Sequence, residues 1–319
     1  MPHLLSYAAM ACPGKQILHA TDEPHSLVNN SEHLFVAIDP VAFSVGPLSV
    51  HWYGIMYFLS FILFWAWGHW LAKNRTWWGW TPQDVGDFLF YGMLGVVLGG
   101  RIGYVLFYSF DSLMQDPLFI FKITQGGMSF HGGLQGVIAA MWWFGQRSGR
   151  SFWQVADFVA PLAPLGLGLG RIGNFLGGEL WGRVSDVPWA VVFPNAIQPG
   201  GWQSEQIRAA WASGSLDHLA RHPSQLYQAF GEGLLLFLLL AVYSSKPRPI
   251  AAVSGLFLAA YGCFRFMAEF FREPDEHIGF LWGEWLTMGM VLSLPMVLAG
   301  AIIMVYAYRM AGKAAASDI

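Results

Sequence analysis

Three arginines lie within long apolar segments of the 319-residue sequence: Arg101, Arg171 and Arg265. Charged residues inside a membrane are rare and usually face a cavity or a partner, although a long side chain can also reach the nearer interface. Arginine carries a planar fork of donors that suits bidentate phosphate binding, and it stays charged in a poor dielectric. These residue types predict a binding site for a phosphate-like anion.

Two histidines, His51 and His131, begin other apolar segments. If successive segments cross a membrane in opposite directions, the three arginines lie in the last third of their spans. All five side chains then converge at one depth, just below the outer interface, and Glu232 lies near the same level. Independent snorkelling of each arginine does not explain why none of them lies at the inner end. Convergence therefore favours a shared site.

The depth of this site narrows its chemistry, because the phosphates and glycerol backbones of the outer lipid leaflet lie at that level. A histidine with an ordinary pKa near 6.5 is able to accept a proton at neutral pH. Arginine and histidine together at phosphate depth predict an enzyme that acts on a phospholipid head group.

The composition is that of an integral membrane protein. Hydrophobic residues make up 55% of the chain and charged residues 12%, whereas soluble domains carry roughly 25% charged residues. Sixteen Trp and 25 Phe add an aromatic content that is typical of membrane interfaces. This composition excludes a pair of ordinary soluble domains, and we expect no nucleic-acid partner.

Seven apolar runs between polar breaks are candidate transmembrane helices. They cover residues 50–72, 84–107, 131–146, 153–176, 225–244, 252–271 and 284–308. The predicted fold is an all-α polytopic membrane protein with about seven transmembrane helices and a small head, residues 177–224, between spans four and five. Residues 38–309 form the predicted membrane domain, residues 1–37 a polar, mobile N-terminal extension, and residues 310–319 a tail.

Basic residues indicate the orientation, because loops rich in Lys and Arg stay in the cytoplasm. The breaks after spans one, three, five and seven hold Lys73, Arg75, Arg147, Arg150, Lys246, Arg248, Arg309 and Lys313. The opposite loops hold fewer basic residues, and these are more dispersed. The N-terminus and the head are therefore predicted to lie outside, and the C-terminus in the cytoplasm.

The stretch GLGLGRIGNFLGGELWG at 166–182 matches the dinucleotide-binding pattern G-x-G-x-x-G at Gly168, Gly170 and Gly173. That pattern needs a preceding strand and a soluble βαβ unit, and neither is predicted here. The glycines are better interpreted as close helix packing, with room for a lipid head group beside Arg171.

Three other patterns have simple interpretations. Ser129 partly matches a serine-hydrolase motif, but we favour a helix-capping turn. His218 and His222 have metal-ligand spacing, yet Pro223 and the lack of nearby carboxylates argue against a metal. Cys263 is expected to be a small buried hydrophobe rather than a nucleophile. We expect neither a metal nor a cofactor.

Arg265 and Glu269 are spaced i, i+4, which places them on one helix face, where the carboxylate is able to hold the arginine in orientation. Arg272 follows two turns after Arg265, at the outer surface. An ordinary ion pair at a helix end is the simpler alternative. The predicted depth of Arg265 and Glu269 in the membrane instead favours a place in the shared site.

Eight motifs together resemble bacterial prolipoprotein diacylglyceryl transferases. They occur in order over residues 38–309: HWYGIMY (51–57), GGRIGYVLFY (99–108), GGMSFHGG (126–133), GRIGNF (170–175), GELWGR (178–183), RHPSQLY (221–227), KPRP (246–249) and YGCFR…EFFREPD (261–275). The resemblance implies a seven-span inner-membrane enzyme with a periplasmic head. It would move the diacylglyceryl group of phosphatidylglycerol to the lipobox cysteine in the signal peptide of a prolipoprotein, releasing glycerol 1-phosphate.

The resemblance also implies roles for individual residues. It marks His131, Arg171, Arg265, Tyr53, Asn174 and Gly182 as essential, and Glu179, Tyr261, Glu269 and Arg272 as important. His131 would be the base, Arg171 and Arg265 would bind the phosphodiester, and the others would position the arginines or the lipid head group. Gln228 is a departure, because the family pattern has a glutamate after HPSQLY.

Other functions remain open from the sequence alone. Arginine and histidine inside spans also line the paths of transporters, although a transporter predicts polar residues at the midplane and symmetric halves. A phospholipid hydrolase or a head-group transferase could use the same side chains with water or another acceptor.

Overall fold

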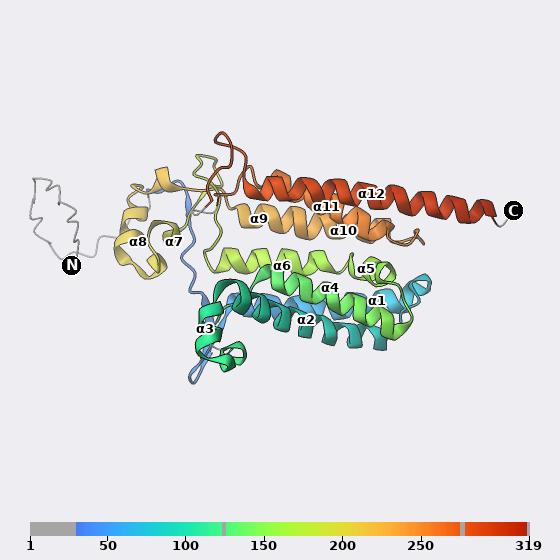
Figure 1. Cartoon of the computed structure of the whole chain (residues 1–319). Coiled ribbons are helices and arrows are strands. Elements are labelled where there is room, and N and C mark those ends of the chain that lie inside the picture. Colours follow the sequence, from blue (N-terminus) through green and yellow to red (C-terminus); the bar gives the residue numbers. More distant parts are fainter. Residues whose placement is uncertain (1–29, 123–125, 275–277, 318–319) are drawn as a thin grey trace, which may run out of the picture.

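The computed structural model describes residues 30–122, 126–274 and 278–317. Most of the predicted N-terminal extension therefore lies outside the described residues. The helices form two groups side by side, with the small elements of the head gathered at one end (Figure 1). One group contains α1, α2, α4, α5 and α6, and the other contains α9 to α12.

Helical segments, several of them short, cover most of each of the seven predicted apolar runs. The first group comprises α1 (Trp52–Asn74), α2 (Pro82–Tyr108), α4 (Phe130–Ser148), α5 (Phe152–Val159) and α6 (Ala163–Leu176). The second comprises α9 (Ser224–Gln228), the π-helical turn η6 (Ala229–Leu235), α10 (Leu236–Tyr243), α11 (Ala252–Ala268) and α12 (Met288–Ser317).

Within the described residues, four helical segments are long and apolar enough to cross a membrane: Trp52–Asn74, Pro82–Tyr108, Ser224–Tyr243 and Met288–Ala314. A fifth span results if α5 and α6, which meet at an angle of 49°, are counted as one broken span. Pro161 lies in the break, where a residue without a backbone N–H is unable to continue the helix. The chain is thus a multi-pass membrane protein, as its composition predicts.

Glycines let the helices of the first group approach closely. A Cβ built on Gly103 of α2 would lie 2.8 Å from the Cα of Gly132 on α4. A Cβ on Gly168 of α6 would lie 3.1 Å from the Cα of Gly233 in η6, which joins the two groups. Such contacts between small residues are the usual means of helix packing in membranes. The second contact places the middle of α6 against the turn that carries Glu232.

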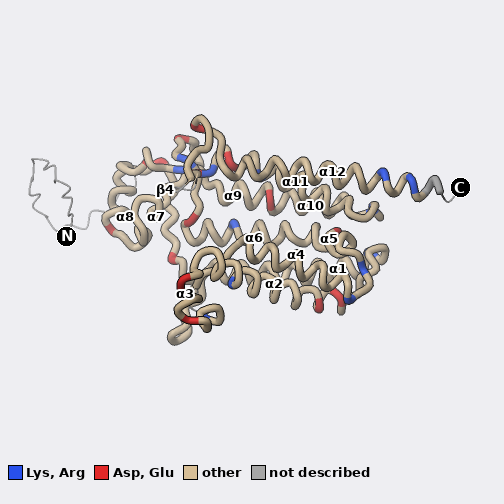
Figure 2. The backbone as a smooth tube through the Cα atoms, viewed as in Figure 1, with Lys and Arg blue, Asp and Glu red and all other residues tan. Residues whose placement is uncertain are grey.

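The two groups are also joined at the end away from the head. The carboxylate of Asp157 on α5 accepts hydrogen bonds from the backbone N–H groups of Ala251 (2.6 Å) and Ser254 (2.8 Å) at the start of α11. Arg75, which follows α1, donates to the Ser244 hydroxyl at 2.9 Å and to the Ala241 carbonyl at 3.1 Å. Basic residues are also present at this end (Figure 2).

The short 3-10 helix η1 (Thr76–Trp78) follows α1 at the end away from the head. The remaining short elements lie at the end of the bundle that carries the head. They are β1 (Leu34–Phe35), β2 (Val41–Val45), β3 (Leu48–His51), α3 (Phe110–Gln115), η2 (Pro117–Phe121), β4 (Val191–Val192), α7 (Pro194–Ile197), η4 (Gly201–Gln203), α8 (Glu205–Ala212) and η5 (Asp217–Leu219). β1 pairs in parallel with β4, and β2 pairs antiparallel with β3. A small core of Ala190, Val192 and Ala220 supports the segment 177–224.

Candidate active site

Arg171 and Glu232 form the ion pair that links the two helix groups. The Nη2 atom of Arg171 on α6 lies 3.4 Å from Oε2 of Glu232 in η6. The Glu232 side chain is fully buried, whereas that of Arg171 retains 20% exposure. Because Arg171 remains partly accessible while its partner carboxylate is buried, the arginine is able to bind a second anion.

Arg265 on α11 shares the same carboxylate. Its Nη1 atom lies 3.8 Å from Oε1 of Glu232 and donates to Oε1 of Gln228 at 3.1 Å. Its Nη2 atom pairs with Oε1 of Glu269, which confirms the i, i+4 pair predicted from the sequence. Glu232 therefore bridges two arginines that come from different helices.

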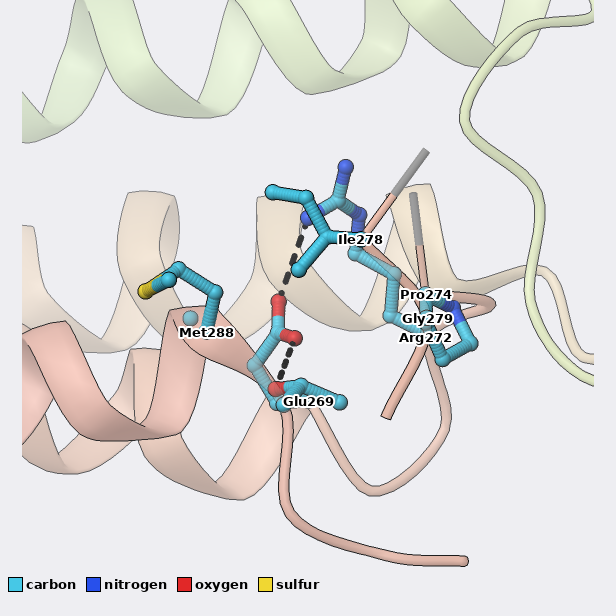
Figure 3. A pocket seen from close by; sticks show the side chains of 8 residues that line it. Glu269, Arg272, Pro274, Ile278, Gly279 and Met288 are labelled. Carbon is cyan, nitrogen blue, oxygen red and sulfur yellow. Dashed lines mark hydrogen bonds and ion pairs between the residues drawn. The ribbon is translucent and has the colours of Figure 1, made fainter. Parts of the chain in front are cut away.

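Glu269 extends this cluster toward the C-terminal end of α11. Its Oε1 atom also lies 3.3 Å from Nη1 of Arg272, and its Oε2 atom accepts a hydrogen bond from the Thr287 hydroxyl at 2.6 Å (Figure 3). A cavity of about 20 Å³ beside Glu269, Arg272 and Met288 has room for one water rather than for a lipid head group. We call Arg171, Arg265, Arg272, Glu232 and Glu269 the arginine cluster.

Two tyrosines border the arginine cluster. Tyr261, one turn before Arg265 on α11, interacts with Arg171, Glu232 and Arg265. Tyr53, at the start of α1, interacts electrostatically with Arg171 and with Glu179. A Cβ on Gly173 of α6 would lie only 3.1 Å from the Tyr53 ring, so a glycine at this position lets the ring pack against α6.

The chain after α6 is held in an unusual turn around Glu179. The backbone N–H of Glu179 donates to the carbonyl of Asn174, and its own carbonyl accepts from Nε2 of Gln225 at 2.7 Å. Leu180 has a positive φ of 57°, which is uncommon for a residue with a side chain, and its carbonyl accepts from the Ser224 hydroxyl. The HPSQLY segment thus fixes this turn and leaves the Glu179 side chain exposed.

Gly182 is buried between two backbone segments rather than presented to a ligand. Its N–H donates to the carbonyl of His222, and the next N–H, of Arg183, donates to the carbonyl of Phe271, both at 2.9 Å. A Cβ at position 182 would lie 2.5 Å from each of these carbonyl oxygens. This position has no room for any side chain.

Replacing Gly182 by alanine is expected to destabilise the protein by about 1–3 kcal/mol, because both flanking backbones must move apart. Thermal unfolding of the purified protein measures this as a lower Tm. Gly86→Ala is the matched control, since a Cβ on Gly86 of α2 meets nothing within 4 Å. Equal Tm values for the two variants would contradict the steric account.

His131 lies in the first turn of α4, toward the end of the bundle that carries the head. Ser129 caps this helix by accepting a hydrogen bond from the N–H of Gly132, as the capping interpretation predicts. The imidazole is exposed, and within the described residues it has neither a hydrogen bond nor an ion pair. The structure therefore leaves the predicted base accessible but does not connect it directly to the arginine cluster.

Arg101 does not join the cluster, contrary to the convergence predicted from the sequence. It is 2% exposed, and its guanidinium donates to carbonyls of the segment that precedes α4. These acceptors belong to Phe119, Ile120, Lys122, Gly126 and Gly127. Arg101 therefore fixes the backbone of the segment that leads to His131. Its donor groups are occupied by these carbonyls.

Two further expectations have clear outcomes. Cys263 is exposed on α11, so its predicted burial is wrong, because an apolar residue of a membrane helix also suits a surface that faces lipid. The G-x-G-x-x-G match lies wholly inside α6, which follows the helix α5 rather than a strand, as expected from the rejection of the dinucleotide interpretation. Glu232 bridges Arg171 and Arg265, a contact that its position in the sequence did not predict.

Comparisons with known proteins show similarity over most of the chain. The family model for prolipoprotein diacylglyceryl transferase matches residues 40–306. The phosphatidylglycerol–prolipoprotein diacylglyceryl transferase of Vibrio campbellii is 54% identical over 278 residues, which cover 86% of this chain and 93% of the relative. That of Pasteurella multocida is 54% identical over 282 residues, covering 88% of this chain and 96% of the relative. The chain belongs to the prolipoprotein diacylglyceryl transferase family.

Proposed function

We propose that this protein transfers the diacylglyceryl group of phosphatidylglycerol to prolipoproteins. The acceptor is the thiol of the lipobox cysteine in the signal peptide, and glycerol 1-phosphate leaves. The observation that carries the proposal is that Arg171 and Arg265, on different helices, pair with the same buried carboxylate, that of Glu232. The similarity to transferases of that name over most of the chain supports the reaction.

The reaction needs a base and a site for negative charge. The thiol loses its proton and attacks the glycerol carbon next to the phosphate, the carbon–oxygen bond breaks, and a phosphate monoester departs. Arg171 and Arg265 bind the phosphodiester and stabilise the charge that grows on the leaving group. His131, exposed at the start of α4, accepts the thiol proton directly or through water.

The neighbouring residues position these groups. Glu269 and Arg272 fix Arg265 from the outer side, and Tyr261 contacts Arg171 from α11. The other predicted site residues lie on or next to the turn after α6 and at the start of α1: Asn174, Glu179, Gly182 and Tyr53. Glu179, exposed near Tyr53, is placed to meet the glycerol head group, whereas Gly182 acts through the backbone packing around it.

The same proposal includes a topology. Seven spans within residues 38–309 cross the bacterial inner membrane, with the N-terminus and the head, residues 177–224, in the periplasm. The C-terminus and the tail, residues 310–319, lie in the cytoplasm, as the basic loops predict. The arginine cluster then lies at the depth of the phosphates of the periplasmic leaflet, where phosphatidylglycerol is available.

A transfer assay tests the function. Purified protein is mixed with phosphatidylglycerol and a lipobox peptide, and mass spectrometry is used to detect the diacylglyceryl thioether. The expected result is a thioether on the cysteine peptide and none on a peptide with serine in place of cysteine. Turnover of the lipid without the cysteine would identify a hydrolase instead, and no turnover would reject both enzymes.

A further inference from the structure

Gln228 has a buried side-chain amide beside Arg265, and it has no role in the mechanism proposed above. It is the last residue of α9, directly before the turn that carries Glu232, and its side chain is 1% exposed. Its Oε1 atom accepts a hydrogen bond from Nη1 of Arg265 at 3.1 Å. Within the described residues its Nε2 atom has no hydrogen-bond partner.

The unpartnered donor lies beside a phosphate-binding arginine. Because Oε1 and Nε2 are bonded to one carbon, Nε2 lies within about 6 Å of Nη1 of Arg265. Buried donors without a partner are rare in folded proteins, and each one calls for a specific explanation such as strain, water or a ligand. A phosphodiester held by Arg265 brings acceptor oxygens into this space.

The lack of charge at position 228 also favours an anionic ligand. The glutamate that the family resemblance predicts here would place a carboxylate beside Arg265, whereas Gln228 adds no negative charge. A phosphodiester, which carries one negative charge, therefore meets less electrostatic repulsion in this chain.

We propose that Gln228 binds the lipid donor: Nε2 donates a hydrogen bond to a non-bridging phosphodiester oxygen while Oε1 orients Arg265. The identity of the lipid as phosphatidylglycerol rests on the proposed function. In this chain the neutral amide strengthens binding of an anionic phosphodiester lipid relative to a zwitterionic one.

Two substitutions separate lipid binding from simple positioning. Gln228→Glu keeps an oxygen for Arg265 but loses the donor and adds a negative charge, whereas Gln228→Met keeps the shape and loses both hydrogen bonds. Both variants are expected to raise the KM for phosphatidylglycerol about tenfold at saturating peptide, with kcat within about threefold. Gln198→Glu, an exposed change of the same kind in the head, is expected to keep both values.

A wild-type KM in Gln228→Glu together with a raised KM in Gln228→Met would overturn the proposal, because it would show that only the contact with Arg265 matters. Unchanged KM values in both variants would overturn it as well.

Binding is measured separately from turnover by the rise in Tm with short-chain phosphatidylglycerol or phosphatidylcholine. The wild type is expected to be stabilised more by phosphatidylglycerol, and Gln228→Glu to lose that difference. This readout holds even if no thioether forms, so rejection of the proposed transfer and rejection of the Gln228 site are distinguishable. A preference for phosphatidylglycerol that is equal in wild type and Gln228→Glu would reject the site.

Discussion

Alanine at Arg171 or Arg265 lowers the rate of diacylglyceryl transfer by about 10³-fold, while the protein still inserts into the membrane. The leaving phosphate gains negative charge in a poorly solvated site, and loss of a single preorganised donor at such a position costs about 10²–10³ in rate. Loss of a guanidinium removes both a charge and a bidentate donor, so we expect the decrease in rate to be at the upper end of that range. The thioether assay measures the rate, and membrane fractionation measures insertion.

Lysine at either position restores charge without the planar fork, and we expect it to recover only a small part of the activity. Arg208→Ala is the matched control. Arg208 lies on α8 with half its side chain exposed, and its nearest carboxylate contact is 3.9 Å, to Glu205. Near-normal transfer in Arg171→Ala or Arg265→Ala would assign that arginine to helix packing or to the interface.

Alanine at Glu232 destabilises the protein by about 3–5 kcal/mol, the range for removing one partner of a buried ion pair. Glu232 is fully buried and faces both Arg171 and Arg265, so its loss leaves two guanidinium groups close together without their shared carboxylate. Glu232→Gln keeps the shape and one acceptor, and a smaller loss is expected. Thermal scans and denaturant titration of the purified protein measure the loss of stability in both variants.

Glu205→Ala is the control for Glu232, since Glu205 is 86% exposed and its ion pair is long. We expect this substitution to lower the free energy of unfolding by no more than about 0.5 kcal/mol. Added phosphatidylglycerol is expected to recover part of the stability of Glu232→Ala, because the lipid phosphate supplies a negative charge to the same arginines. A Tm for Glu232→Ala equal to that of the control would mean that the two arginines do not depend on this carboxylate.

The helices could be predicted closely from the sequence, because apolar runs in membrane proteins are long and end at polar residues. The predicted runs 50–72 and 84–107 correspond to α1 at 52–74 and α2 at 82–108. The run 153–176 is interrupted at Pro161, and hydropathy alone does not give the bend of 49°. The pair of Arg265 with Glu269 could be predicted because both residues lie on one helix.

The contacts between helices could not be predicted in the same way. Arg101 and Arg171 occur in similar Arg-Ile-Gly contexts, yet one binds loop carbonyls and the other a buried carboxylate. The difference depends on the neighbouring backbone, which local sequence does not specify. Glu232 reaches both arginines because Gly168 and Gly233 let α6 and η6 meet, a tertiary contact between residues distant in sequence.

The most direct measurement of the central claim follows the oxygen between the diacylglyceryl group and phosphorus. Phosphatidylglycerol labelled with ¹⁸O at that position is incubated with the protein and the lipobox peptide, and both products are analysed by mass spectrometry. Attack of the thiol on carbon predicts one thioether for each glycerol 1-phosphate, with all the label in the glycerol 1-phosphate. Label retained on diacylglycerol, or phosphate release without thioether, would contradict the account.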